Sequence, residues 1–439
     1  MPQRKECSKR VRNGRRLAVI PSLLGVALAS CLGSVAVAAT PGVAGAAAGA
    51  AGAAAHASGA VWKVVPSADV SPTSEDQLTA VSCPRGSFCA AVGSSGSSTP
   101  LVEVYKAHQW TITAFADTSP PTLSALDGVS CTSARFCMAV GDADSTGPEG
   151  SFIKVPAAET WNGRAWQLIA VPTNPAASGI ETRDQLTAVS CTSPTFCVAS
   201  VVTEAVNFVG DEPVSTLLGY VETWNGSTWA STVSGNQPVA VSCVNPSLCA
   251  AVGTEGGANG GDITLGGESF ADVFNGTTWT KTDFRLPSGY DNGLSGATLT
   301  SVACTTASCL AIGTQQLATE TSPGTYTFGP VTTIDARYRR ARWSTTKVPP
   351  PPMVTNGIAC IEDGTCIGVG ECTSSACGTV GSPLIDRYLS GSWSFVPDPV
   401  SSPSGTLDAV SCRSGSRCTG VGYQLAPGDR TLVVAGPAS

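Results

Sequence analysis

Residues 78–93 read Leu-Thr-Ala-Val-Ser-Cys-Pro-Arg-Gly-Ser-Phe-Cys-Ala-Ala-Val-Gly, and variants of this phrase return six more times along the chain. The first cysteines of successive copies stand 48, 60, 52, 61, 56 and 52 residues apart. A period of this length is typical of propellers and arrays rather than of doubly wound or helical domains. The copies therefore predict seven repeats of one supersecondary unit.

Each phrase is typical of a β-hairpin. An apolar alternation leads to the first cysteine, a short polar turn follows, and a second apolar run begins near the second cysteine. Two β-rich runs joined by a short turn containing Gly, Pro or Ser make a hairpin. We expect the two cysteines of each copy to face each other across the base of that hairpin.

A second hairpin follows in the repeats, because an aromatic residue stands five positions before a tryptophan. Three copies place Asn-Gly directly after the aromatic residue, and Asn-Gly suits a tight turn. Two hairpins per repeat make a four-stranded antiparallel blade. The predicted fold class is thus all-β, a seven-bladed propeller. The aromatic pairs are Tyr105 and Trp110, Trp161 and Trp166, Trp224 and Trp229, Phe274 and Trp279, Tyr338 and Trp343, and Tyr388 and Trp393.

The two ends of the chain complement each other. After Cys418 the last repeat offers strands near 420–422 and 432–434, but no fourth strand with a tryptophan. Residues 61–65, Val-Trp-Lys-Val-Val, supply such a strand ahead of the first repeat. We expect this N-terminal strand to close the seventh blade, since closure pairs the edges that an open ring would expose.

Residues 1–40 resemble a bacterial export signal. Seven basic residues and one acid occupy positions 1–16, and an apolar run from Leu17 to about Thr40 follows. Three outcomes stay open: cleavage and release, acylation of Cys31 in the lipobox-like Leu28-Ala29-Ser30-Cys31, or retention as a membrane anchor. Residues 41–60 are nearly all Ala, Gly and Ser, which predicts a flexible linker before a propeller over 61–439. We expect a secreted or cell-envelope protein.

The charge of the exported part argues against nucleic acid as a partner. Without residues 1–16, 25 − 7 leaves 18 basic residues and 32 − 1 leaves 31 acids, a net charge of −13. An acidic surface repels phosphate backbones. We expect a monomer that meets the membrane only through an N-terminal anchor.

Sixteen of the 18 cysteines lie in the exported part, and closely spaced pairs in an oxidising compartment indicate disulfides. Redox pairs use a two-residue spacing, and zinc needs four ligands together, whereas residues 61–439 hold one histidine, His108. The expected bonds are Cys83–Cys89, Cys131–Cys137, Cys191–Cys197, Cys243–Cys249, Cys304–Cys309, Cys360–Cys366, Cys372–Cys377 and Cys412–Cys418.

Other motifs carry weaker hypotheses. Asp142, Asp144 and Glu149 are spaced so that their oxygens could surround calcium, although a solvated acidic loop has the same pattern; no other cofactor is expected. The tryptophans are expected to pack between blades, with Trp161 and Trp224 as the candidates for exposure. No catalytic set emerges. A Ser-His-Asp triad in residues 61–439 would have to use His108, which we expect in a short turn between the third and fourth strands of its repeat.

The phrase Val-Ser-Cys-x5-Cys-x-Ala-Val-Gly, followed by Trp-Asn-Gly-x-x-Trp, resembles a family of exported, mostly uncharacterised bacterial repeat proteins regarded as β-propellers. The resemblance covers residues 61–439. The turn before Trp229 also resembles the Asp-box of sialidases, but Asn-Gly replaces Asp-x-Gly and no arginine cluster suits a sialic acid carboxylate. The resemblance implies the fold and transfers no catalytic residue.

Function is expected on the blade ends opposite the cysteines, because variable loops on a rigid scaffold commonly carry binding. The leading hypothesis is a non-catalytic module that presents these loops to a protein or a cell-wall glycan, with individual binding residues unassigned. The alternatives are a carbohydrate-active enzyme with its site over the central channel and a purely structural role. The expected loops are 142–152, 201–219, 254–270, 314–333 and 371–383.

Overall fold

The computed structural model describes residues 61–438 except for 85–86, 97–98, 116–121, 148–149, 174–180, 210–211, 234–235, 256–268, 283–295, 317, 323–324, 330–331, 347–352, 374–376, 378, 397–403, 414–416 and 427. The predicted export signal, Cys31 and the linker therefore lie outside the described residues. In the described part, no helix combines the length and the apolar character needed to cross a bilayer.

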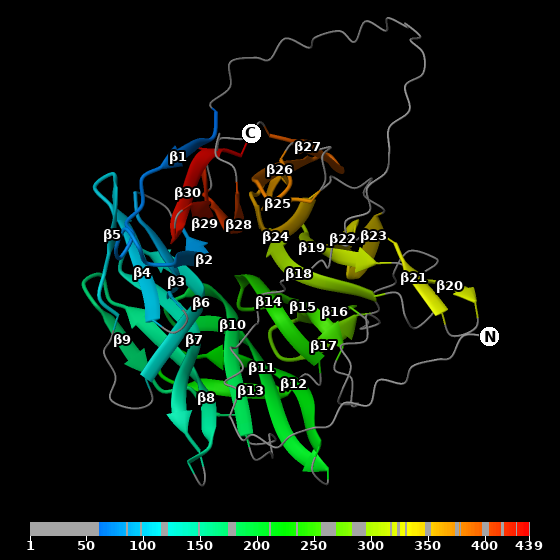
Figure 1. Cartoon of the computed structure of the whole chain (residues 1–439), viewed down its shortest axis with the longest axis horizontal. Coiled ribbons are helices and arrows are strands. Elements are labelled where there is room, and N and C mark those ends of the chain that lie inside the picture. The colour runs from blue at the N-terminus through cyan, green and yellow to red at the C-terminus, as the bar shows by residue number, and fades with distance from the viewer. Residues whose placement is uncertain are drawn as a thin grey trace, which may run out of the picture. The chain divides into compact units, whose positions relative to one another are not determined.

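The described chain is all-β and is built from antiparallel sheets (Figure 1). Four sheets each take four strands from one repeat, in an order that follows the chain. They comprise β2 (Asp76–Ser82), β3 (Cys89–Ser95), β4 (Thr99–Lys106) and β5 (Gln109–Ile112); β14 (Asn236–Asn245), β15 (Leu248–Glu255), β16 (Ser269–Phe274) and β17 (Trp279–Thr282); β18 (Gly296–Cys304), β19 (Cys309–Gln316), β22 (Thr332–Arg339) and β23 (Arg342–Thr346); and β24 (Met353–Cys360), β25 (Cys366–Cys372), β26 (Pro383–Leu389) and β27 (Ser392–Phe395).

The second and third repeats form two further groups of four strands. A single parallel pairing of Arg183 with Lys154 joins the groups into one eight-stranded sheet. Between β19 and β22 the chain adds a separate hairpin of β20 (Ala318–Ser322) and β21 (Thr325–Phe328). The two groups are β6 (Thr122–Ser133), β7 (Phe136–Thr146), β8 (Phe152–Trp161) and β9 (Trp166–Ile169), and β10 (Glu181–Ser193), β11 (Phe196–Val209), β12 (Glu212–Trp224) and β13 (Trp229–Val233).

The last repeat completes its sheet with the N-terminal strand, the pairing that the sequence predicted. β28 (Gly405–Cys412), β29 (Arg417–Ala426) and β30 (Gly428–Pro437) are joined by β1 (Lys63–Val65), which runs antiparallel to β30. Trp62, next to β1, is 2% exposed. A Cβ atom on Gly436 would lie 2.4 Å from its indole, so the indole occupies the space that an aromatic side chain fills in the other sheets.

Each of the first six repeats carries a row of cysteine, cysteine, aromatic residue and tryptophan across its sheet. In the first repeat Cys89 pairs with Tyr105, which pairs with Trp110. The ring centroids of the six aromatic pairs lie 5.1–5.5 Å apart. Disulfides join all eight cysteine pairs suggested by the sequence spacing.

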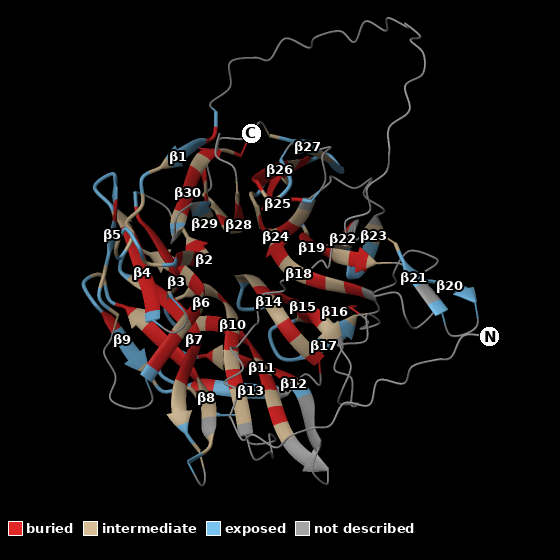
Figure 2. Cartoon of the chain, viewed as in Figure 1, coloured by how far each residue is buried: buried red, intermediate tan, exposed pale blue. Residues whose placement is uncertain are grey.

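The expectation that Trp161 and Trp224 are exposed was wrong. They are 3% and 6% exposed, because the turn after each indole folds over the disulfide hairpin of its own sheet. Their Nε1 atoms donate hydrogen bonds to the carbonyl oxygens of Ala134 and Pro194 in those hairpins, each at 3.1 Å. Burial is concentrated on the inner strands and falls on the outermost ones, such as β5 and β27 (Figure 2).

The Asn-Gly turns also differ from the tight two-residue turns that the sequence suggested. Four residues connect Trp161 to its partner Trp166, and only the glycine, Gly163, has a positive φ, 96°. Asn162 Oδ1 instead accepts hydrogen bonds from the backbone amides of Arg164 and Ala165, at 3.0 and 3.1 Å. Two-residue turns with two positive φ angles occur where Asn-Gly is missing, as at Ala107 and His108.

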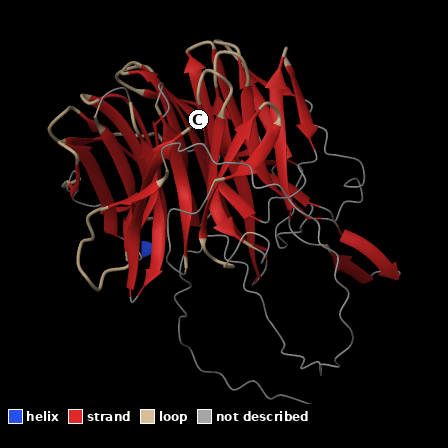
Figure 3. Ribbon diagram, turned by 90° about the horizontal axis from the view of Figure 1, so that it is seen from above, coloured by secondary structure: helices blue, strands red, loops and turns tan. Residues whose placement is uncertain are grey.

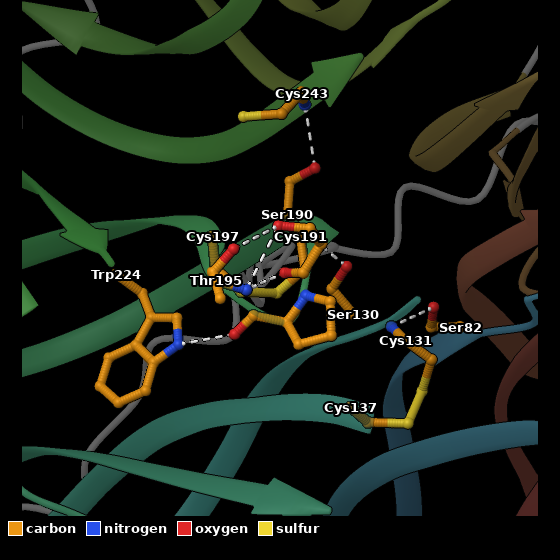
Figure 4. Close-up of a disulfide and its surroundings, with 12 residues drawn as sticks. Ser82, Ser130, Cys131, Cys137, Ser190, Cys191, Thr195, Cys197, Trp224 and Cys243 are labelled. Atoms are coloured by element: carbon orange, nitrogen blue, oxygen red, sulfur yellow. Dashed lines mark hydrogen bonds between the residues drawn. A yellow bond between two sulfur atoms is a disulfide. The ribbon is translucent and has the colours of Figure 1, made fainter. Parts of the chain in front are cut away.

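The serine of the repeated phrase links neighbouring sheets, a role that the sequence did not reveal. In five places its Oγ accepts a hydrogen bond, at 2.9–3.0 Å, from the backbone amide of the first cysteine in the following repeat (Figure 4). Ala303 and Ala359 replace this serine in the fifth and sixth repeats, so the links from the fifth to the sixth and from the sixth to the seventh repeat lack the hydroxyl. The five pairs are Ser82 with Cys131, Ser130 with Cys191, Ser190 with Cys243, Ser242 with Cys304, and Ser411 with Cys83.

We predict that Ser130→Ala lowers the free energy of unfolding by about 1 kcal/mol, because the amide of Cys191 loses its partner. The reciprocal change Ala303→Ser should raise stability by about 0.5–1 kcal/mol, since it supplies an acceptor for Cys360. Urea unfolding of the two variants beside the wild type measures both effects. Unchanged stability in Ser130→Ala would show that the inter-sheet bond contributes nothing.

Strands make up most of the described chain (Figure 3), and the lengths of these strands differ between repeats at the sheet ends opposite the disulfides. The expected loop 201–219 is not a loop, because β11 and β12 continue as a paired ribbon to Val209 and Glu212. β11 has 14 residues, whereas β3 in the first repeat has 7. The expected loop 314–333 contains the β20–β21 hairpin, which stands apart from the four-stranded sheets in Figure 1. The third repeat therefore extends furthest as regular strand.

Candidate functional site

A β-bulge interrupts the first strand of all seven repeats and gives one residue a special position. In the first repeat it falls at Thr79, whose Oγ1 donates a hydrogen bond to the carbonyl of Leu126 in the next sheet, at 3.1 Å. Bulges re-aim side chains and are common beside functional sites. The bulge residues are Thr79, Asp127, Thr187, Val239, Thr300, Asn356 and Asp408.

The bulge also explains the glycine that ends the phrase. A Cβ atom at Gly93 would lie 2.0 Å from the carbonyl oxygen of Gln77, so a side chain there would force the two strands apart. Glycine thus permits the close backbone approach in the first repeat, whereas the third repeat keeps its bulge with Val201 at the matching position.

Asp408 is the centre of an acidic cluster between the last two repeats. Burial, followed by the charge of Glu371, raises the pKa of Asp408 to about 7. Asn356 Nδ2 donates to Asp408 Oδ1 at 3.4 Å and to the carbonyl of Leu407 at 3.1 Å. Burial likewise raises the pKa of Glu371 and of Tyr423, and Asp408 contributes to the latter shift. Two interacting carboxyls with raised pKa values beside a phenol are groups that can hold and exchange a proton.

Asp127 is the matching bulge acid of the second repeat and has a different environment. Burial is the main cause that raises its pKa to about 6. Gln185 Nε2 donates to Asp127 Oδ2 at 2.9 Å. Nearby, Asp142 Oδ2 lies 2.5 Å from both Lys154 Nζ and Ser124 Oγ. This cluster contains a cation, Lys154, that neutralises one acid, whereas no cation is among the described groups that shift the pKa of Asp408.

The calcium hypothesis stays a prediction. Asp142 is buried and its Oδ2 is engaged by Lys154, while Glu149 lies outside the described residues. Among the residues that the structure describes, no group of three or more His, Cys, Asp or Glu side chains could hold a metal ion.

A third set of acids recurs on the third strand of five repeats, two residues before the aromatic residue. These side chains are at most 5% exposed. Burial is the largest cause that raises the pKa of Glu103 to about 8 and those of Glu222 and Asp386 to about 7. Their repetition was visible in the sequence as an acid, one residue and an aromatic, but the sequence did not show that they are buried. The set is Glu103, Glu159, Glu222, Asp272 and Asp386.

Two cavities lie at the disulfide ends of the sheets, away from these acids. The larger, about 90 Å³, lies between the sheets of the last and first repeats. The smaller, about 10 Å³, lies between the fifth and sixth repeats. Neither is lined by a carboxylate, so the carboxylate pair around Asp408 does not line either of them.

No protein-family model matches the sequence, and no curated protein matches it. Among solved structures, the chain is similar to the α-L-arabinofuranosidase Arb93A from Fusarium graminearum over 86% of this chain and 97% of that one, with 9% identity and a TM-score of 0.45. A mutant of the Aleuria aurantia lectin in complex with α-methyl-L-fucoside is similar over 75% of this chain and 98% of that one, with 13% identity and a TM-score of 0.39. The polysaccharide lyase Uly1 is similar over 87% of this chain and 93% of that one, with 10% identity and a TM-score of 0.45. Similarity at this level assigns neither a family nor a function.

Proposed function

We propose that residues 61–438 form a closed seven-bladed propeller that acts outside the cell as a non-catalytic binding module. Contacts between the first strands of successive sheets support the ring, including a contact between β28 and β2. The bond from Cys83 to Ser411 Oγ and the pairing of β1 with β30 link the last repeat to the chain start. Eight disulfides are typical of proteins from oxidising compartments.

The observation that carries this function is the contrast between the two ends of the blades. At the disulfide end, turns pack on turns: a Cβ atom at Gly226 would lie 2.9 Å from Thr195 Cγ2, and indoles donate to the turn carbonyls. At the other end, β11 and β12 continue as a two-stranded ribbon. A rigid base with a projecting ribbon suits the display of a recognition surface. The partner that we propose is a protein or a cell-wall glycan.

Shortening the ribbon tests this function. Ala205 and Thr216 are paired, so residues 206–215 can be replaced by Asn-Gly, which closes a two-residue hairpin. We expect the wild type to be retained by cell-envelope fractions and the shortened variant to lose at least about tenfold in affinity, equivalent to 1.4 kcal/mol. The same fractions should show no newly released reducing ends.

An equal shortening elsewhere provides the matched control. Replacing the β20–β21 hairpin, Ala318 to Phe328, by a short glycine linker removes another projecting segment, and we expect retention to persist. Both variants should unfold at the same urea concentration as the wild type. Equal retention of wild type and ribbon variant would contradict the proposed role of the ribbon.

The carbohydrate-active enzyme has one specific observation in its favour, the interaction of Glu371 with Asp408. Glycosidases use two carboxyls of different pKa. Release of reducing ends in the retention experiment, abolished by Asp408→Asn, would establish this alternative in place of the binding module.

A further inference from the structure

The larger cavity, at the junction of the last and first repeats, is lined by two arginines and two aromatic rings. Arg413 and Arg417 come from the disulfide hairpin of the last repeat, and Tyr105 and Trp110 from the first repeat. Arg413 Nη2 donates to Cys89 Sγ at 2.9 Å. The hydroxyl of Thr419 and the apolar side chains of Val65, Val433 and Ala435 on β1 and β30 complete the lining.

The sequence of the last repeat explains why a cavity exists at this junction. The residue before the second cysteine is phenylalanine in the first three repeats: Phe88, Phe136 and Phe196. Phe88 stacks on Trp161 of the next sheet with ring centroids 6.4 Å apart. In the last repeat Arg417 holds this position, and Arg413 follows the first cysteine, where the other repeats have an uncharged residue. The position that holds a phenyl ring in the first three repeats therefore holds a guanidinium group at this junction.

Charge makes this cavity different from the rest of the molecule. The chain carries a net charge of −7, yet Arg413 and Arg417 line one small space, and none of the described residues in its wall is acidic. Burial is the largest cause that lowers the pKa of Arg413, and the charge of Arg417 lowers it further, so both burial and the neighbouring cation disfavour the charged form. An anion placed between the guanidinium groups would offset that cost, and arginine pairs well with planar or tetrahedral oxyanions.

We propose that this junction binds a small oxyanion group, a carboxylate or a phosphate, carried by a cell-envelope polymer. At about 90 Å³ the cavity is far smaller than the 300–1,000 Å³ of ordinary small-molecule sites, so it admits one such group while the remainder of the polymer stays outside. The site lies at the disulfide end of its sheet, whereas the ribbon projects from the other end of the third repeat. The proposed anion site is therefore independent of the role proposed for the ribbon.

Calorimetric titration of the intact protein with D-glucuronate and with glycerol 3-phosphate tests the site, with glucose and glycerol as uncharged controls. We expect binding of at least one anion, no binding of the uncharged compounds, and weaker binding as salt is added. Arg417→Phe restores the side chain of the first three repeats and should weaken binding at least about tenfold, as should Arg413→Ala. The anion that binds identifies carboxylate or phosphate as the recognised group.

Arg430→Ala is the matched control, because Arg430 lies in the same repeat, is exposed, and donates only to the Pro72 carbonyl among the described contacts. It removes one positive charge from the same sheet and should bind the anions like the wild type. Failure of both anions to bind, or wild-type affinity in Arg417→Phe, would overturn the proposal. Loss of envelope retention on ribbon shortening is a separate readout, so the two proposals fail independently.

Discussion

Replacing Trp62 with alanine should lower the free energy of unfolding by about 3–5 kcal/mol, the usual loss for a buried tryptophan. The indole is 2% exposed and belongs to a core cluster with Ile367 and Val369 of the sixth repeat and Val434 of the last. One side chain from the start of the described chain therefore packs on two sheets formed near its end. Truncation would remove this packing and weaken the edge at which β1 joins β30.

Guanidinium chloride unfolding measures the effect. Val64→Ala, on the same short strand, is the control, because Val64 is 49% exposed and its truncation should change stability by less than about 0.5 kcal/mol. If the two variants were destabilised equally, the N-terminal strand would not be closing the last sheet.

Stability should fall as the pH rises from mildly acidic to mildly alkaline. The pKa of Glu103 is raised from 4.5 to about 8, mainly by burial. Between these values the unfolded chain has lost the proton that the folded chain retains, so stability is fully present below about pH 4.5 and is lost as the pH passes 8. We expect a loss on the order of 3–5 kcal/mol from this group, with further losses near pH 7 from Glu222 and Asp386.

Urea unfolding at acidic, neutral and alkaline pH tests this dependence. Glu103→Gln keeps the shape of the side chain and cannot ionise. The free energy of unfolding should therefore depend less on pH, by the contribution of one titrating group, and the variant should be more stable than the wild type at alkaline pH. Glu75→Gln removes an exposed carboxyl nearby and should leave the slope nearly unchanged. A slope equal to that of the wild type in Glu103→Gln would show that this carboxyl does not ionise between the two pH values.

Much of the fold was predictable because the signals that define it are local. A cysteine at each end of a short turn, and an aromatic residue five positions before a tryptophan, set strand pairs within one repeat, and the structure has those pairs. The pairing of the N-terminal strand was predictable because the last repeat lacks a tryptophan after Cys418, and Trp62 stands ahead of the first repeat. The exposure expected for Trp161 and Trp224 was wrong because their burial depends on how two turns meet, which spacing does not encode.

The candidate sites depend on contacts between repeats, and the sequence pointed to them only weakly. Asp408 stands where three other repeats have threonine, but its neighbour Glu371 comes from the preceding repeat. Arg413 and Arg417 were visible as a departure from the repeated phrase, yet their position opposite Tyr105 requires the last sheet to lie against the first. The loop expected at 201–219 proved to be strand because pairing between β11 and β12 continues beyond the end of the blade.

The sequence by itself determined the all-β class, the repeat count and the disulfide pairs, since each follows from residues close together in one repeat. It also determined the strand supplied by the N-terminus, because the last repeat lacks its fourth strand. Tertiary structure alone decided the serine links, the buried acids and the two-arginine cavity. These features arise where the side chains of one sheet meet the backbone or rings of the next. Such contacts join residues about 50 or more positions apart, and in the case of Cys83 and Ser411 they join residues 328 positions apart, beyond the reach of any local pattern.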